Sequence, residues 1–254
     1  GTWKTIGSGQ AGAHGIKTDG TLWGWGLGYN GRGGYGNTDT ISSPRQLPGT
    51  NWAQVMESEL FSMATKTDGT LWMWGKNSYG QLGQNSKTEY SSPRQIPGDT
   101  WSYDDQNKIA TQDEQLAAAI KTDGTLWMWG YQNYGQLGQN ESGINSKSSP
   151  VQIPGTNWSQ VAGSFYTYAC TRTDGTLWGW GANLGGQLSQ NNRTQYSSPV
   201  QIPGTTWSKI ASGFIAAMAI KTDNTLWSWG YNGNGQLGHN NKTNYSSPKQ
   251  IPGT

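Results

Sequence analysis

The sequence predicts an all-β protein, a five-bladed β-propeller whose four-stranded antiparallel blades each contain about 50 residues. The pattern Lys-Thr-Asp-Gly-Thr-Leu-Trp-x-Trp-Gly occurs five times, with Arg172 opening the fourth copy and Asn224 replacing glycine in the fifth. A further tryptophan opens each repeat, at Trp3, Trp52, Trp101, Trp158 and Trp207. This period of short apolar segments, without a 3.6-residue periodicity, is typical of propeller blades.

Each copy of the pattern predicts a β-hairpin. Asp-Gly between two apolar runs favours a type I′ turn, in which both central residues have positive φ. Side chains alternate along the strand that follows, so the two tryptophans of each copy share one face. We interpret these tryptophans as packing between blades, where each buries on the order of 150–250 Å²: Trp23, Trp25, Trp72, Trp74, Trp127, Trp129, Trp178, Trp180, Trp227 and Trp229.

The last repeat shows the four strands of a blade. We expect them at residues 207–211, 216–220, 226–229 and 246–253. Proline has no backbone N–H to donate to a neighbouring strand, so its presence in the fourth segment fits an outer edge strand. Residues 1–254 are expected to form a single propeller domain with blades at about 1–51, 52–100, 101–157, 158–206 and 207–254. The first and last blades would then meet by packing and close one ring.

Composition excludes several classes of function. Charged residues make up 13% of the chain and the net charge is +2, which gives no basic face for nucleic acid. No apolar run is long enough to insert into a membrane. We find no nucleophile–histidine–acid set, metal-ligand cluster or phosphate-binding glycine loop, so we expect no enzyme, cofactor or metal. The Asn-, Gln-, Ser- and Thr-rich composition favours an extracellular, cell-surface or virion location.

A family resemblance follows from the segment after each hairpin. Residues 74–83 and 229–238 match Trp-Gly-x-Asn-x-x-Gly-Gln-Leu-Gly, and residues 129–138 have glutamine for asparagine. This pattern resembles the regulator of chromosome condensation repeat, which implies a β-propeller. The family typically closes seven blades, whereas this chain has five repeats. Blade one also departs from the pattern at Arg32, and blade four departs from it at Ser189.

The loops between the first and second strands differ most between repeats, and loops on a rigid scaffold commonly carry binding residues. Two interpretations remain open: these loops recognise a partner, or their apolar side chains plug the channel mouth. The candidate binding residues are Gln10, Glu57, Glu59, Phe61, Asp113, Glu114, Phe165, Tyr166, Phe214 and Ile215.

A basic residue opens every hairpin and predicts a basic ring at the opposite end of the blades. Its members are Lys17, Lys66, Lys121, Arg172 and Lys221. An aspartate lies two residues after each of them, so we interpret the ring as structural.

Three functions are compatible with these patterns. The first is a non-catalytic protein-binding or scaffold propeller, on a microbial surface or a virus particle, that engages a protein partner through the variable loops. The second is a lectin-like propeller that binds glycans with exposed aromatic residues and amides around Tyr79, Tyr90, Tyr134, Tyr196 and Tyr245. The third, nucleotide exchange on a small GTPase, is implied by the family resemblance alone.

Overall fold

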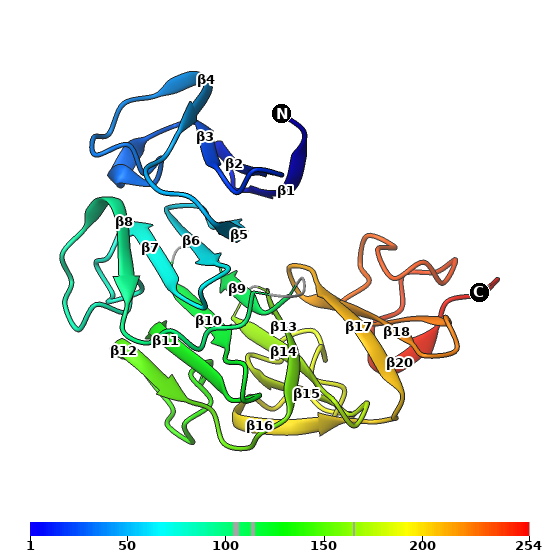
Figure 1. Ribbon diagram of the computed structural model, residues 1–254. Helices are drawn as coiled ribbons and strands as arrows, with labels where there is room; N and C mark the ends of the chain where they lie inside the picture. The colour runs from blue at the N-terminus through cyan, green and yellow to red at the C-terminus, as the bar shows by residue number, and fades with distance from the viewer. Residues whose placement is uncertain (104–106, 113–114, 165, 254) are drawn as a thin grey trace. The chain divides into compact units, whose positions relative to one another are not determined.

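The computed structural model describes residues 1–103, 107–112, 115–164 and 166–253, and here twenty strands form five antiparallel sheets of four strands each (Figure 1). Within every sheet the strands lie in sequence order, so each sheet is a meander of neighbouring hairpins. The predicted all-β architecture of five four-stranded blades is confirmed. We number the sheets as blades 1 to 5 along the chain.

The strand bounds follow the repeats. Blade 1 consists of β1 (Trp3–Ser8), β2 (Gly12–Lys17), β3 (Leu22–Gly26) and β4 (Ile41–Gln46), with the short 3₁₀ turn η1 (Tyr29–Gly31) after β3. Blade 2 consists of β5 (Trp52–Glu57), β6 (Phe61–Lys66), β7 (Leu71–Gly75) and β8 (Tyr90–Ile96). Blade 3 consists of β9 (Ile109–Gln112), β10 (Leu116–Ile120), β11 (Leu126–Gln132) and β12 (Asn145–Gln152). Blade 4 consists of β13 (Trp158–Ser164), β14 (Thr167–Arg172), β15 (Leu177–Gly181) and β16 (Tyr196–Ile202). Blade 5 consists of β17 (Trp207–Ser212), β18 (Ala216–Lys221), β19 (Leu226–Gly230) and β20 (Tyr245–Gln250).

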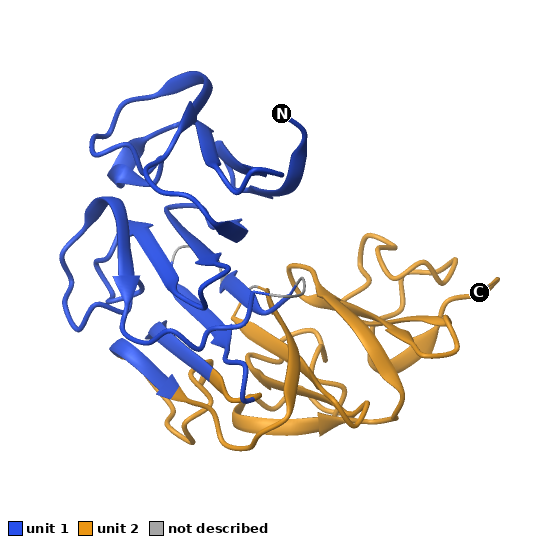
Figure 2. Cartoon of the chain, viewed as in Figure 1, with its two compact units in different colours: residues 1–123, 127–131, 146–151 blue, residues 124–126, 132–145, 152–254 orange. Residues whose placement is uncertain are grey.

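The chain divides into two compact units, shown in different colours in Figure 2. Unit 1 comprises residues 1–123, 127–131 and 146–151, and unit 2 comprises residues 124–126, 132–145 and 152–254. Unit 1 therefore contains blades 1 and 2 and part of blade 3, and unit 2 contains the remainder. That all five blades form one closed domain stays a prediction.

The hairpin turn differs from the predicted type I′ turn. Gly20 has φ +77°, but Asp19 is not among the residues with positive φ. The amide of Gly20 donates to the carbonyl of Lys17 at 2.9 Å, and Lys17 N donates to Thr21 O at 2.9 Å. This is a three-residue loop with one left-handed residue at its end. Asn224, with φ 66°, takes the same position in blade 5, because asparagine tolerates this conformation better than most residues.

Consecutive blades within each unit share apolar cores. In unit 1, Leu22 and Leu47 of blade 1 pack in one buried cluster with Trp52 and Val55 of blade 2. A second cluster joins blades 2 and 3, and a cluster in unit 2 joins blades 4 and 5. A four-stranded blade is thus covered by its neighbour in the sequence, as expected of repeats that cannot bury their own faces.

Candidate functional site

The basic residue of every hairpin is enclosed by indole rings. In blade 2, Lys66 Nζ lies 4.7 Å from the ring centroid of Trp52 and 4.5 Å from that of Trp72. Both distances lie within the range of a cation–π contact. We call this arrangement the cation–indole clamp. The other four clamps are Lys17 with Trp3 and Trp23, Lys121 with Trp101 and Trp127, Arg172 with Trp158 and Trp178, and Lys221 with Trp207 and Trp227.

A chain of hydrogen bonds connects each clamp to its turn. The hydroxyl of Thr70 donates to Asp68 Oδ1 at 2.6 Å, and the Thr70 amide donates to the same oxygen at 3.0 Å. Trp72 Nε1 in turn donates to Thr70 Oγ1 at 2.8 Å. The Thr70 hydroxyl, as the largest cause, lowers the pKa of Asp68 below its ordinary value. In the other turns the equivalent threonine, two residues after the aspartate, likewise lowers the pKa of Asp19, Asp174 and Asp223.

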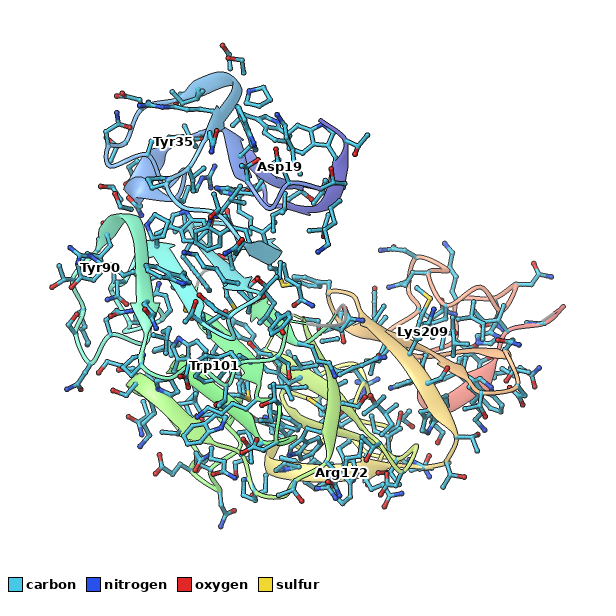
Figure 3. All side chains as sticks on the ribbon, viewed as in Figure 1. Asp19, Tyr35, Tyr90, Trp101, Arg172 and Lys209 are labelled. Carbon is cyan, nitrogen blue, oxygen red and sulfur yellow. The ribbon has the colours of Figure 1, made fainter. Side chains whose placement is uncertain are left out.

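These contacts lie within single blades, and that the five basic residues form a structural ring stays a prediction. The ammonium or guanidinium group is held between two rings, and the aspartate is bonded to its own turn. Asp19, Trp101 and Arg172, from three different blades, are labelled in Figure 3. The hairpin end of each blade therefore uses its charged and aromatic groups largely within the blade.

The second tryptophan of each repeat connects one blade to the preceding one. Trp74 Nε1 of blade 2 donates to the carbonyl of Arg32 in blade 1 at 2.8 Å, and Trp129 Nε1 donates to the carbonyl of Gln81 at 2.8 Å. In unit 2, Trp180 bonds Gln136 O at 2.8 Å and Trp229 bonds Gln187 O at 2.9 Å. All four of these indoles are completely buried: Trp74, Trp129, Trp180 and Trp229.

Buried amides shape the turn that supplies this carbonyl. Gln81 Oε1 accepts from the Tyr79 amide at 2.9 Å, while Asn77 Oδ1 accepts from the Leu82 amide at 2.9 Å. In blade 1 the corresponding position is Arg32, which is also buried but donates to carbonyls, from Nε to Leu27 O at 2.8 Å and from Nη1 to Glu59 O. At this position blade 1 therefore has a side chain that donates to backbone carbonyls, whereas Gln81 of blade 2 accepts from a backbone amide.

The variable-loop candidates fall into four groups. Gln10 and Phe214 are exposed, Phe214 by 64%, whereas Glu59, Tyr166 and Ile215 are partly buried. Phe61 lies in β6 and Glu57 lies in β5, and both are buried. Asp113, Glu114 and Phe165 lie outside the described residues.

Glu57 forms a buried pair with a histidine of blade 1. His14 Nδ1 lies 3.0 Å from Glu57 Oε2, and each side chain is 1% exposed. His14 Nε2 is 3.4 Å from the carbonyl of Gly33, and the imidazole meets the Trp74 ring edge-on at 5.5 Å between centroids. Burial, followed by the charge of Glu57, raises the pKa of Tyr35 to about 12. This polar cluster belongs to the junction between blades 1 and 2.

An aromatic pair lies at the variable end of unit 2. The ring of Tyr166, from the loop between β13 and β14, contacts that of Tyr134 at 5.0 Å between centroids with the two planes tilted by 42°, and both residues are partly exposed. Tyr166 has φ 58°, a conformation that is uncommon for a bulky side chain. Leu184, in the loop that follows β15, is 54% exposed. Because the first-to-second and third-to-fourth connections of a meander lie at the same end, these three side chains belong to one end of the blades.

Among the described residues, one groove, the lack of a metal-binding group and the single cysteine bear on possible chemistry. A groove of about 400 Å³ in unit 1 is lined by residues of β1 and β5 and by Asn107 and Ile109. Among the described residues, no group of three or more His, Cys, Asp or Glu side chains could hold a metal ion. Cys170 is buried, and desolvation raises the pKa of its thiol well above the ordinary value. None of the helices in the described part of the chain is sufficiently long and apolar to cross a membrane.

Two features of these sites are not among the predictions from the sequence. One is the pairing of His14 with Glu57, although each replaces a nonionisable residue of other blades: His14 stands where blade 2 has Met63, and Glu57 stands where blade 5 has Ser212. The presence of these two ionisable residues, one in blade 1 and one in blade 2, is the signal from which the pair could have been predicted. The other is the cation–indole clamp, which follows once the tryptophan that opens a repeat is paired with the basic residue, as Trp52 pairs with Lys66.

Known proteins resemble this chain in sequence and in fold. The Regulator of chromosome condensation (RCC1) repeat matches residues 68–102, 123–170, 174–218 and 223–254, and a second model of the repeat matches residues 207–236. The RCC1 domain-containing protein RUG3, mitochondrial, of Arabidopsis thaliana is 32% identical over 188 residues, which are 70% of this chain and 42% of that protein. The chain thus spans less than half of this curated relative.

Solved structures show the same fold at lower identity. Human WBSCR16 superposes with a TM-score of 0.83 at 20% identity, over 98% of this chain and 67% of that one. Prp20p of Saccharomyces cerevisiae, described with its binding properties to Gsp1p and histones, gives a TM-score of 0.82 at 17% identity, over 98% of this chain and 63% of that one. The repeat matches cover more than half of the sequence, and the five sheets have the fold of these propellers. The chain belongs to the regulator of chromosome condensation (RCC1) repeat family.

Proposed function

We propose that this chain is a non-catalytic protein-binding propeller that engages its partner through the variable end of its blades. Family membership supports protein binding as the general activity. Prp20p is described with binding to Gsp1p and histones, and another structure shows Kap60 bound to it. The blades supply a rigid scaffold, and the loops between the first and second strands supply the variable contacts.

The observation that carries this proposal is the aromatic pair of Tyr134 and Tyr166. Its two rings are partly exposed, and Tyr166 keeps an unfavourable positive φ. Strained backbone persists where the surrounding structure enforces it, and such residues concentrate at functional sites. Two partly exposed tyrosine rings in contact, with the exposed Leu184 at the same end of the blades, give an amphipathic surface of the kind that protein interfaces favour.

The structure favours this function over glycan binding. Sugar recognition would use amides beside exposed aromatic rings, but one amide near the start of each of four long loops is fully buried and bonded within its own loop: Asn77, Gln132, Asn183 and Asn232. Asn183, for example, donates to the carbonyls of Asn192 and Thr194 and accepts from Leu188 N. Tyr245, from the lectin set, bonds Asn241 and Lys249 through its hydroxyl.

Binding to immobilised Gsp1p, core histones and Kap60 tests the proposal, with a glycan array as the parallel arm. We expect the chain to bind at least one of the three proteins and the double variant Tyr166→Ser/Leu184→Ser to lose at least tenfold in affinity. A nucleotide-release assay on Gsp1p separates simple binding from exchange activity.

Thr173→Ser is the matched control, because Thr173 is exposed in the turn of the same blade at its hairpin end. This variant should bind like the parent chain. The proposal is contradicted by binding that survives the double variant and is lost in Thr173→Ser. It is also contradicted by a chain that binds glycans and none of the three proteins.

A further inference from the structure

A polar pocket of about 450 Å³ lies between the long loops of blades 3 and 4, entirely within unit 2 (Figure 2). Both loops connect a third strand to a fourth strand, so the pocket belongs to the variable end of the blades. Its lining includes Asn133, Tyr134, Ser142, Arg193, Thr194 and Ser197. Tyr134 also contacts Tyr166, so the pocket adjoins the aromatic pair.

Hydrogen bonds on both sides fix the backbone that carries Arg193. The amide of Thr194 donates to Asn192 Oδ1 at 2.9 Å. Nδ2 of the fully buried Asn183 donates to the carbonyl of Asn192 and to that of Thr194, each at 3.0 Å. The loop therefore presents the guanidinium group from a fixed backbone.

The wall from blade 3 is attached directly to blade 4. The amide of Asn140 donates to the carbonyl of Ser197 at 2.8 Å, and the amide of Tyr134 donates to Gln136 Oε1 at 2.6 Å. An added Cβ at Gly135 would meet the Cα of Ser197 at 2.6 Å, so the two loops leave no space between them there. The pocket is preformed, which lowers the cost of ordering its walls when a ligand binds.

Charge in unit 2 favours an anionic ligand. This unit contains six basic and three acidic residues. Asp174 and Asp223 bond their own turns at the hairpin end, and Glu141 Oε2 accepts from Asn145 Nδ2 at 2.8 Å. Arg193 is exposed and has no hydrogen bond, ion pair or ring contact within the described part of the chain. A guanidinium group presents a planar set of donors that matches a carboxylate.

We propose that this pocket binds a carboxylate from an acidic segment of the protein partner, with Arg193 as the residue that pairs with it. The hydroxyl groups of Ser142 and Thr194 supply further donors. The ring of Tyr134 and the side chain of Ile144, which is 82% exposed and follows the lining residue Gly143, suit an aliphatic residue next to the acidic one. Complementary charge contributes specificity and speed of association. The inference rests on the proposed protein-binding function and specifies the charge that the partner brings.

An NMR titration of the full chain tests the pocket with two short peptides. The acidic probe is the acetylated and amidated peptide Leu-Glu-Glu-Leu, and the neutral probe is Leu-Gln-Gln-Leu with the same ends. The acidic peptide should shift the signals of the Arg193 Nε–H and the Tyr134 amide and should bind about fivefold more tightly than the neutral one. Arg193→Gln should remove this preference, and Arg193→Lys should retain part of it.

Lys242→Gln is the matched control, because it removes the same charge from the equivalent turn of blade 5. There the amide of Thr243 donates to Asn241 Oδ1 at 2.9 Å, as Thr194 does to Asn192, but Lys242 is not part of the pocket lining. This variant should keep the preference for the acidic peptide. An equal loss in both Gln variants overturns the proposal, because the net charge of unit 2 would then account for binding. Equal affinity for the two peptides also overturns it, as does tighter binding of an oligoglucuronate with two carboxylates.

Binding to immobilised Gsp1p, core histones and Kap60 separates this inference from the proposed function. Arg193→Gln should weaken binding to any of these proteins that the parent chain binds. If Tyr166→Ser/Leu184→Ser loses that binding and Arg193→Gln keeps it in full, the proposed function stands and the pocket assignment is overturned. A parent chain that prefers the acidic peptide through Arg193 and binds none of the three proteins supports the pocket and counts against the proposed function.

Discussion

Blades 1 and 2 have nearly the same sequence pattern and the same strand order, yet the corresponding faces of the two blades differ in exposure. In blade 2, Trp52, Val55 and Trp74 are almost completely buried, because blade 1 covers them. In blade 1, Trp3 and Ile6 are largely exposed. The local pattern therefore determines the strands of a blade, whereas the burial of its tryptophans depends on the neighbouring blade.

The largest expected effect is a difference in the free energy of unfolding between variants of Trp74 and of Trp25. Trp74→Ala should reduce the free energy of unfolding by about 3–5 kcal/mol, because it removes a fully buried indole and leaves a cavity. Trp25→Ala, at the equivalent place of blade 1, should lower it clearly less, since that ring is already partly exposed. Urea unfolding of the two variants under identical conditions measures the difference, and equal losses would show that both indoles are equally buried in solution.

The buried pair of His14 and Glu57 gives a second test of how much the contact between blades 1 and 2 contributes to stability. Glu57→Ala leaves His14 without its carboxylate in a buried site and should cost about 3 kcal/mol of stability. The double variant His14→Met/Glu57→Ser installs residues that blades 2 and 5 use at these positions and should recover most of that loss. A double-mutant cycle in urea checks the coupling, and additive effects of the two substitutions would contradict a direct interaction.

A smaller effect is expected at the cation–indole clamp of blade 2. Lys66→Met keeps the aliphatic packing but removes the charge over two rings, which should cost about 1 kcal/mol. Lys66→Arg should be close to neutral, because Arg172 occupies the same clamp in blade 4. Thermal unfolding compares the two variants with the parent chain. If Lys66→Met matched the parent while Lys66→Arg did not, packing would outweigh the cation–π contact.

The smallest expected effect concerns a histidine of blade 5. Burial, then the charge of Lys249, lowers the pKa of His239 below its ordinary value of 6.5. The unfolded chain then binds a proton that the folded chain does not, so this contribution to stability is complete above about pH 6.5 and is lost as pH falls through the lowered pKa. His239→Gln, which copies Gln84 of blade 2, should flatten this part of the pH–stability curve. An unchanged curve between pH 5 and 7 would contradict the assignment.

Most of the fold could be predicted from the sequence. Turn and strand signals recur five times at fixed spacing, and the strands observed at β17 to β20 follow those expected for the last repeat. The type of turn could not be predicted from Asp-Gly alone. The hydrogen bonds from Thr21 to Asp19 and from Gly20 to Lys17 form a three-residue loop, and they depend on residues on both sides of the dipeptide.

The candidate site was less predictable, because loop residues were grouped by sequence variability rather than by exposure. The variable-loop group holds both Phe61 and Phe214, yet Phe61 is the first residue of β6 and is fully buried, whereas Phe214 precedes β18 and is 64% exposed. The difference comes from their neighbours: Phe61 belongs to the core cluster shared by blades 2 and 3, whereas Phe214 belongs to the last repeat. Contacts with another blade are not encoded in the local pattern.

The central claim is that the second tryptophan of each hairpin is held by a hydrogen bond to the preceding blade. Hydrogen exchange of the indole N–H groups, followed by NMR in a dilute sample, tests this claim most directly. The account predicts slow exchange at Trp74, Trp129, Trp180 and Trp229, whose N–H groups bond a carbonyl of the preceding blade. It predicts fast exchange at Trp25, which is partly exposed and has no such bond to a carbonyl among the described residues. Protection of Trp25 equal to that of the other four in the monomer would contradict it.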